Sequence, residues 1–184
     1  LPATLVDYGT IVGEYGVWFL PYIVSHLSGP HVEVQAILEE KQSVKTLVEA
    51  EAFIQRVLHY QRVIDGVIEK LEHDKRLGVL PPDFVLRNTI KNLNALSTAP
   101  ERHTVTQAFA SKILEAKLPN AEQLTERLKT AMTTSFIPAT QKLIATLQSE
   151  LPYASHQAGI VGLPNGKALY QAMILHLADS TLSA

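Results

Sequence analysis

Apolar residues recur at steps of three and four over residues 46–78, the spacing that places side chains on one face of an α-helix. This first stripe consists of Leu47, Ile54, Val57, Leu58, Ile64, Val67, Ile68 and Leu71. Thr46 and Glu49 have the spacing of a capping box, and Gly78 is suited to a C-terminal cap. The pattern therefore predicts one amphipathic helix over this range.

A second long helical pattern runs from Asn120 to Pro152. Its apolar positions are Leu124, Leu128, Met132, Ile137, Leu143, Ile144, Leu147 and Leu151. Asn120 and Gln123 are a candidate capping box. Pro138 lies inside the pattern, and because proline lacks an N–H and collides with the preceding turn, we expect a kink there.

Shorter patterns complete an all-α expectation. A helix is expected to begin at Pro81–Asp83 and another to carry Val105, Phe109 and Ile113. A short helix is plausible over 34–40, and a last helix or extended segment covers 168–177. Residues 1–45 read as an irregular lead-in segment, because glycine and proline interrupt their apolar runs. We therefore predict one helical region, 1–184, with long antiparallel helices, an irregular N-terminal segment and a kinked helix near Pro138.

Composition and charge exclude several classes of protein. The net charge is -2, which does not favour nucleic-acid binding, since such binding needs an excess of clustered Lys and Arg. The chain has no cysteine, so disulfides, thiolate metal sites and a cysteine nucleophile are ruled out within it. The longest apolar stretch, residues 16–24, is too short to span a bilayer. We therefore expect a soluble chain, and the sequence does not decide its cellular compartment.

The histidines do not form a recognisable catalytic or metal motif. There are seven of them, no two at i, i+4, and no His-Glu-x-x-His pattern occurs. Ser25–His26 and Ser155–His156 are neighbours in sequence, but a nucleophile and its base need a spatial arrangement that adjacency does not provide. The sequence therefore predicts no catalytic residue and no metal site in this chain.

A glycine-punctuated segment over 162–168 is superficially similar to a phosphate-binding loop. It has Val161 where the motif needs glycine and Ala168 where it needs a hydroxyl. A Pro-Asn-Gly turn, with Pro164 at its second position and Gly166 closing it, is favoured. A role of this turn in shaping a ligand cleft remains the alternative.

Three stretches of the chain together resemble the motifs of one known family. The first is Leu20–Pro21 through Leu27-Ser28-Gly29-Pro30-His31, and the second is Ile137-Pro138-Ala139 with Leu143, Leu151–Pro152 and Ala154. The third and most specific is Gly159, Leu163-Pro164-Asn165-Gly166-Lys167 and Tyr170. In order and spacing, over nearly the whole chain, they resemble the bacterial domain of unknown function number 885. Its last residues depart from the family pattern, retaining His176 and Leu182, which could alter the substrate preference of a parent protein.

The resemblance implies a helical zinc-metallopeptidase-like hydrolase with a cleft. Its metal-binding and later family motifs would lie downstream of the part represented here, so zinc is implied for the whole family protein and no cofactor for this chain. The chain would then be an N-terminal portion: a truncated product, an isolated region or a degenerate homologue. The family is bacterial, and export to the cell envelope is an open alternative.

These observations lead to two alternative functions. In the first, the chain is a non-catalytic cleft wall, inactive alone, whose partner is the C-terminal catalytic part and whose substrate is a peptide. Asn165, Tyr170 and His176 are the candidate substrate-binding residues, because polar groups on a loop beside a packed scaffold are where ligand contacts concentrate. In the second, it is a helical protein–protein interaction module without an enzymatic role. If the C-terminal part normally covers an apolar face, the isolated chain should self-associate or expose a large apolar patch, whereas a clean monomer without such a patch would favour the interaction module.

Overall fold

The computed structural model describes residues 22–168 and 170, which are helical with irregular connections and contain no strand. The elements are α2 (Pro30–Ala36), the π-helix η1 (Ile37–Lys41), α3 (Leu47–Arg76), α4 (Asp83–Leu96), the 3₁₀ turn η2 (Pro100–Arg102), α5 (Thr104–Glu115), α6 (Ala121–Ala131), the π-helix η3 (Met132–Phe136), α7 (Ile137–Glu150), and the 3₁₀ turns η4 (Leu151–Tyr153) and η5 (Ile160–Gly162). The all-α class is confirmed. Over the described range, no helix has the length and apolarity needed to cross a bilayer.

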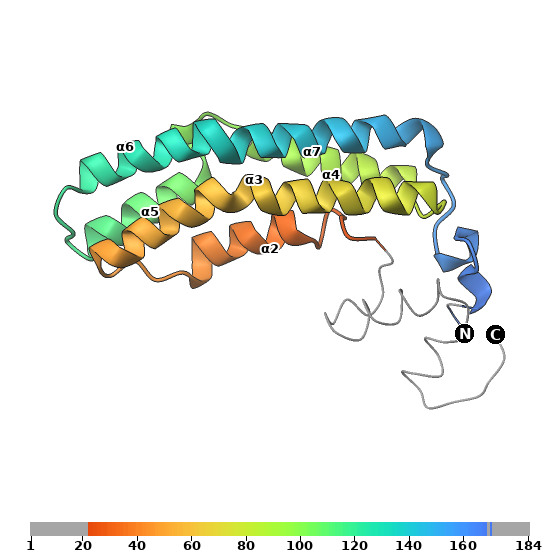
Figure 1. The fold of residues 1–184 in the computed structure, drawn as a ribbon, viewed down its shortest axis with the longest axis horizontal. Coiled ribbons are helices and arrows are strands. Elements are labelled where there is room, and N and C mark those ends of the chain that lie inside the picture. Colours follow the sequence, from red (N-terminus) through yellow and green to blue (C-terminus); the bar gives the residue numbers. More distant parts are fainter. Residues whose placement is uncertain (1–21, 169, 171–184) are drawn as a thin grey trace, which may run out of the picture.

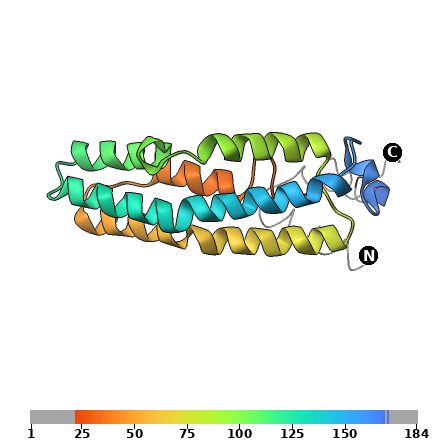
Figure 2. The ribbon, with the colours of Figure 1, turned by 90° about the horizontal axis from the view of Figure 1, so that it is seen from above.

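The helices form an elongated bundle of four rods. Two rods are long: α3 is one, and α6, η3 and α7 together make the other (Figure 1). Helices α4 and α5 follow one another along a third rod, and α2 with η1 makes a short fourth rod (Figure 2). The short helix over 34–40 was therefore expected in the right region, although it begins earlier and ends as a π-helix.

The two long rods pair with one another but run in the same direction. Three ties join them: the Arg127 guanidinium to Glu51, the Ser135 hydroxyl to the Leu58 carbonyl at 2.8 Å, and Lys142 to Asp65 at 2.7 Å. Both partners advance together along the sequence, as only parallel helices allow. The expectation of antiparallel long helices is corrected, because α4 and α5 carry the chain back before the second rod begins. Antiparallel packing holds between α4 and α7.

The core lies between the rods, where the predicted stripes meet. The Tyr60 ring stacks on Phe136 with centroids 3.9 Å apart, and the His103 ring meets Phe136 edge-on at 5.2 Å. Most of the first stripe is buried, but Leu47 and Leu58 are largely exposed and lie outside the core. The packed face of α3 also includes Ala50, Phe53 and Tyr60, which the predicted stripe lacked.

The helix ends and the proline follow local sequence only in part. Thr46 and Glu49 form the predicted capping box of α3, and Gly78 has a positive φ of 75° at its C-terminal end. Asn120 does not cap α6 with its side chain, since its backbone is left-handed and closes a turn. At Pro138 the distortion is a wide π-helical turn: the Ile137 N–H donates to the Met132 carbonyl five residues back. That turn precedes the proline, where an α-helical hydrogen bond is lost.

The segment before α2 is a tight polar turn. The Ser25 hydroxyl accepts the N–H groups of Leu27 and Ser28 at 3.2 and 3.0 Å. Gly29 has a φ of 127°, and a Cβ there would lie 2.5 Å from the Ile23 carbonyl oxygen. Glycine is therefore required at this position, and the turn directs His31 into the interior, where it is 5% exposed. The described part of the first family-like stretch, residues 22–31, therefore has a structural role.

Candidate functional site

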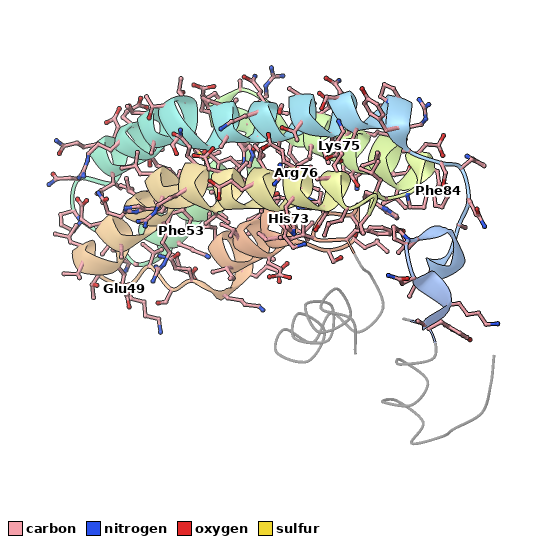
Figure 3. All side chains as sticks on the ribbon, turned by 45° about the vertical axis from the view of Figure 1, so that its right-hand side comes forward. Glu49, Phe53, His73, Lys75, Arg76 and Phe84 are labelled. Carbon is pink, nitrogen blue, oxygen red and sulfur yellow. The ribbon has the colours of Figure 1, made fainter. Side chains whose placement is uncertain are left out.

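The candidate site is the end of the bundle at which α3 and α7 end and α4 begins. We call it the C-terminal end of the bundle. Figure 3 shows Lys75 and Arg76 in the last turn of α3, and Phe84 toward the segment that follows α7. The turn after η5 also reaches this end, because the Pro164 ring lies 3.3 Å from the position a Cβ would take on Gly78. Four chain segments therefore converge here.

A carboxylate holds an exposed imidazole at this end. Asp83, the first residue of α4, accepts a hydrogen bond from His156 Nδ1 at 2.7 Å, and its own N–H donates to the Ser155 carbonyl at 2.9 Å. The Phe84 ring meets the imidazole edge-on at 5.7 Å. The hydrogen bond from His156 lowers the pKa of Asp83. The charges of His156 and Arg87 lower it further.

This pair has chemistry available to it. The side chain of His156 is 84% exposed, so its second ring nitrogen is accessible from solvent. A carboxylate that binds one imidazole nitrogen fixes the ring orientation, which suits the other nitrogen to bind a polar group or transfer a proton. The arrangement can therefore bind or orient a ligand without any further residue, whereas nucleophilic catalysis would need more.

A buried carboxylate lies at the same end of the bundle. Glu150, the last residue of α7, is 1% exposed, and neither carboxylate oxygen has a hydrogen-bond partner among the described residues. Burial raises the pKa of Glu150 to about 7; the Lys75 charge opposes the rise and the Asp74 charge adds to it. Asp74 is itself paired with Lys70, and the Lys75 ammonium lies 4.2 Å above the Tyr153 ring.

The predicted substrate-binding residues are only partly placed. The turn was predicted correctly: the Gly166 N–H donates to the Leu163 carbonyl at 2.9 Å, and Asn165 is exposed with a φ of 57°. Tyr170 is 45% exposed. His176 lies outside the described residues. Within the described range, no hydrogen bond joins Asn165 or Tyr170 to the Asp83–His156 pair, so their role in binding stays a prediction.

Sequence reasoning missed the Asp83–His156 pair and Glu150. Asp83 was interpreted as a helix-start residue, which it is, and His156 was considered only beside Ser155. Its partner is 73 positions away, so no local pattern could connect them. Glu150 sits at a position where a carboxylate is ordinarily solvated. The one available signal was that it lies within the second apolar pattern, three residues after Leu147 and directly before the Leu151–Pro152 stop.

Polar groups elsewhere in the bundle are structural. His103 is 1% exposed, and its Nδ1 accepts the Val105 N–H at 3.2 Å as a helix cap. A pocket of about 500 Å³ at the other end is lined by residues 40–45 and by Lys112, Glu115 and Ala116. There the Lys112 ammonium donates to the carbonyls of Leu38 and Gln42, both at 2.9 Å, and so closes the end of η1.

The described residues do not fit a zinc site of the kind the family resemblance implies. Such a site needs three or more protein ligands. Among residues 22–168 and 170, no group of three His, Cys, Asp or Glu side chains is close enough to hold a metal ion. His156 and Asp83 are two potential ligands that are already bound to one another. No zinc-dependent step can be assigned to these side chains.

Comparisons with known proteins identify related sequences and structures. A family model described as "Bacterial protein of unknown function (DUF885)" matches residues 3–184. The chain is also similar to a crystal structure described as that of a putative lipoprotein from Colwellia psychrerythraea, with 27% sequence identity and a TM-score of 0.83. The match covers 89% of this chain and 28% of that chain. No curated protein matches the chain.

Proposed function

The chain belongs to the bacterial DUF885 family, and from this premise we propose that it is a non-catalytic helical region forming one wall of a substrate cleft in a larger protein. The chain spans less than a third of the length of the structurally similar protein. A region of this size in a longer fold can supply rigid scaffolding while other polypeptide supplies the reactive groups. The activity, substrate and partner of such a whole protein are part of the proposal.

The observation that carries the proposal is the Asp83–His156 pair at the C-terminal end of the bundle. An imidazole that a carboxylate orients and that is exposed to solvent is available to a ligand, which supports a ligand-facing surface here. The pair is held by the first turn of α4 and the segment after α7, so its position is fixed by the bundle. We place the cleft-facing surface here, with Asn165, Tyr170 and His176 as further candidates for contact with the substrate.

A more specific proposal concerns the chemistry of the larger protein. The sequence motifs resemble a zinc-metallopeptidase-like family, which makes a peptide the expected substrate. Because the described residues do not fit a three-ligand site, the metal and its general base are proposed to belong to polypeptide other than this chain. The purified chain should then bind no zinc at one-to-one stoichiometry with high affinity and should not hydrolyse peptides. Tight stoichiometric zinc binding in a calorimetric titration would refute this division of roles.

The cleft wall is tested directly by peptide binding. In an NMR titration of the labelled chain with a mixture of short unstructured peptides, amide shifts are expected at 83–84, 153–157 and 163–168. His156→Gln should weaken the response, while His59→Gln, an exposed change on α3, should leave it unaltered. Shifts confined to the opposite end of the bundle would contradict the placement of the wall.

One observation favours the second function, a helical protein–protein interaction module. Four large apolar side chains are exposed at or beside the C-terminal end of the bundle: Leu77, Phe84, Tyr153 and Tyr170. Exposed apolar groups gathered in one region are typical of protein contact surfaces. Light scattering on the isolated chain should then show self-association that Phe84→Ser relieves and Val48→Ser, at the other end, does not. A chain that stays monomeric at all concentrations would contradict the docking of a second copy on this surface.

A further inference from the structure

The last turn of α3 and the first residues after α7 are joined by a single cation. The Lys75 ammonium lies over the Tyr153 ring, in the geometry of a cation–π contact. Tyr153 belongs to η4, the turn that leads directly to Ser155 and His156. The position of Lys75 therefore bears on how the His156 segment is held against the bundle.

The same cation has a second possible partner. Glu150 lies one residue before η4, is almost fully buried, and has no hydrogen-bond donor among the described residues. A buried carboxylate without a donor is unfavourable when ionised and acceptable when protonated. Lys75 lies over Tyr153, which follows Glu150 by three residues, so its ammonium can approach the Glu150 carboxylate once the proton is lost.

The other charged groups around Glu150 do not substitute for Lys75. On α3, Asp74 is an anion and its paired Lys70 is already engaged. On α4, the side chains buried toward the core are Leu86, Thr89 and Leu93, and none is charged. At the start of α4, the Asp83 carboxylate is occupied by His156 and Arg87. Among the described residues, Lys75 is thus the cation acting on Glu150 that is not already engaged in an ion pair.

We propose that Lys75 is a two-position latch: it rests on Tyr153 while Glu150 is protonated, and it pairs with Glu150 when that proton leaves. In the first position the latch holds η4 and the following His156 segment against α3. In the second position the Tyr153 contact is lost and that segment loosens. This regulation rests on the proposed function, because the segment that it releases is the proposed cleft wall.

Two spectroscopic readouts follow the latch in the full chain. The ε-methylene protons of Lys75 lie in the ring current of Tyr153 only in the first position, so their NMR signal should move downfield as the pH rises through about 7. Exchange of two amide protons reports the segment: Ala154 N–H, bonded to the Leu151 carbonyl, and Asp83 N–H, bonded to the Ser155 carbonyl. Their protection should fall at least threefold over the same pH range.

Variants separate Glu150 from other titrating groups. Glu150→Gln should keep the Lys75 signal upfield and both amides protected at every pH. His156→Gln should leave the transition in place, because His156 is not part of the latch. Lys75→Met should leave both amides weakly protected throughout, and the Leu124 N–H, at the far end of the bundle, should respond to none of these changes.

The outcomes are distinct. A transition that persists in Glu150→Gln, or that disappears in His156→Gln, would overturn the latch, as would a Lys75 signal that does not move with pH in the unsubstituted chain. Peptide binding is not measured here, so failure of the cleft-wall proposal would leave these results unchanged. Conversely, if the chain binds peptide but the His156 segment does not loosen as the pH rises, the latch is contradicted and the cleft-wall proposal is not.

Discussion

Two buried titratable groups give the stability of this chain opposing pH dependences. Burial lowers the pKa of His31 to about 4 from 6.5, so between those values the folded state binds fewer protons than the unfolded state. Stability from His31 is therefore present above pH 6.5 and lost as the pH falls toward 4. Burial raises the pKa of Glu150 to about 7 from 4.5, so its contribution is present below pH 4.5 and lost as the pH rises through 7.

The magnitudes are similar, so the two effects largely cancel. At about 1.4 kcal/mol per pH unit, each group accounts for at most about 3.5 kcal/mol. Water that enters when a buried group ionises reduces this, and we expect about 1–3 kcal/mol from each. Between pH 4.5 and 6.5 the contributions of these two groups to the stability of the unsubstituted chain should consequently offset one another, although neither group is indifferent to pH.

Single substitutions reveal the pH dependence that each group contributes to the free energy of unfolding. In urea unfolding followed by circular dichroism at pH 4.5, 5.5, 6.5 and 7.5, His31→Gln should lose stability relative to the unsubstituted chain as the pH rises, because the opposing contribution of His31 is gone. Glu150→Gln should gain stability as the pH rises to 6.5, because His31 then acts without Glu150, and His103, whose pKa is also lowered by burial, acts in the same direction. The exposed changes His59→Gln and Glu69→Gln on α3 serve as controls. Profiles of both core variants that run parallel to that of the unsubstituted chain would refute the reasoning.

Three further stability predictions follow from packing. Phe136→Ala should cost about 3–5 kcal/mol, because the ring is buried between two others, whereas Phe84→Ala should cost much less; chemical unfolding measures both. Gly29→Ala should destabilise the chain by about 1–3 kcal/mol, because its φ is positive and its Cβ would meet a backbone carbonyl oxygen; Gly66→Ala, in open space within α3, should stabilise it by about 0.5–1 kcal/mol. Ser135→Ala should cost about 1 kcal/mol in the same assay, by removing a hydrogen bond between the long rods.

The helices were predictable because their signals are local. The apolar stripe and the Thr46–Glu49 box lie within α3 itself and located it within a few residues. The same reasoning failed at Asn120, because a capping-box spacing does not reveal that the preceding turn forces a left-handed backbone. Pro138 indicated a distortion, but its π-helical form depends on how the chain before the proline packs against α3.

The direction of the long helices and the candidate site could not be predicted in the same way. The direction in which the two long rods pair depends on where the chain turns back, which amphipathic patterns do not specify. The Asp83–His156 contact and the burial of Glu150 arise only when α4 is laid against α7. The Pro-Asn-Gly turn was predicted because its residues specify its shape, and the pairing across the bundle was not because it is long-range.

The shared direction of α3 and the α6–α7 rod also determines how the chain can fold. Two helices joined by a tight hairpin can meet early, but these two are brought together only after α4 and α5 have formed a return path. Their ties join residues 76 or 77 positions apart, so a large loop must close before they are made. We therefore expect slower, more concerted folding than a simple up-and-down bundle shows, and a fragment ending before α6 should leave the inner face of α3 without its main partner.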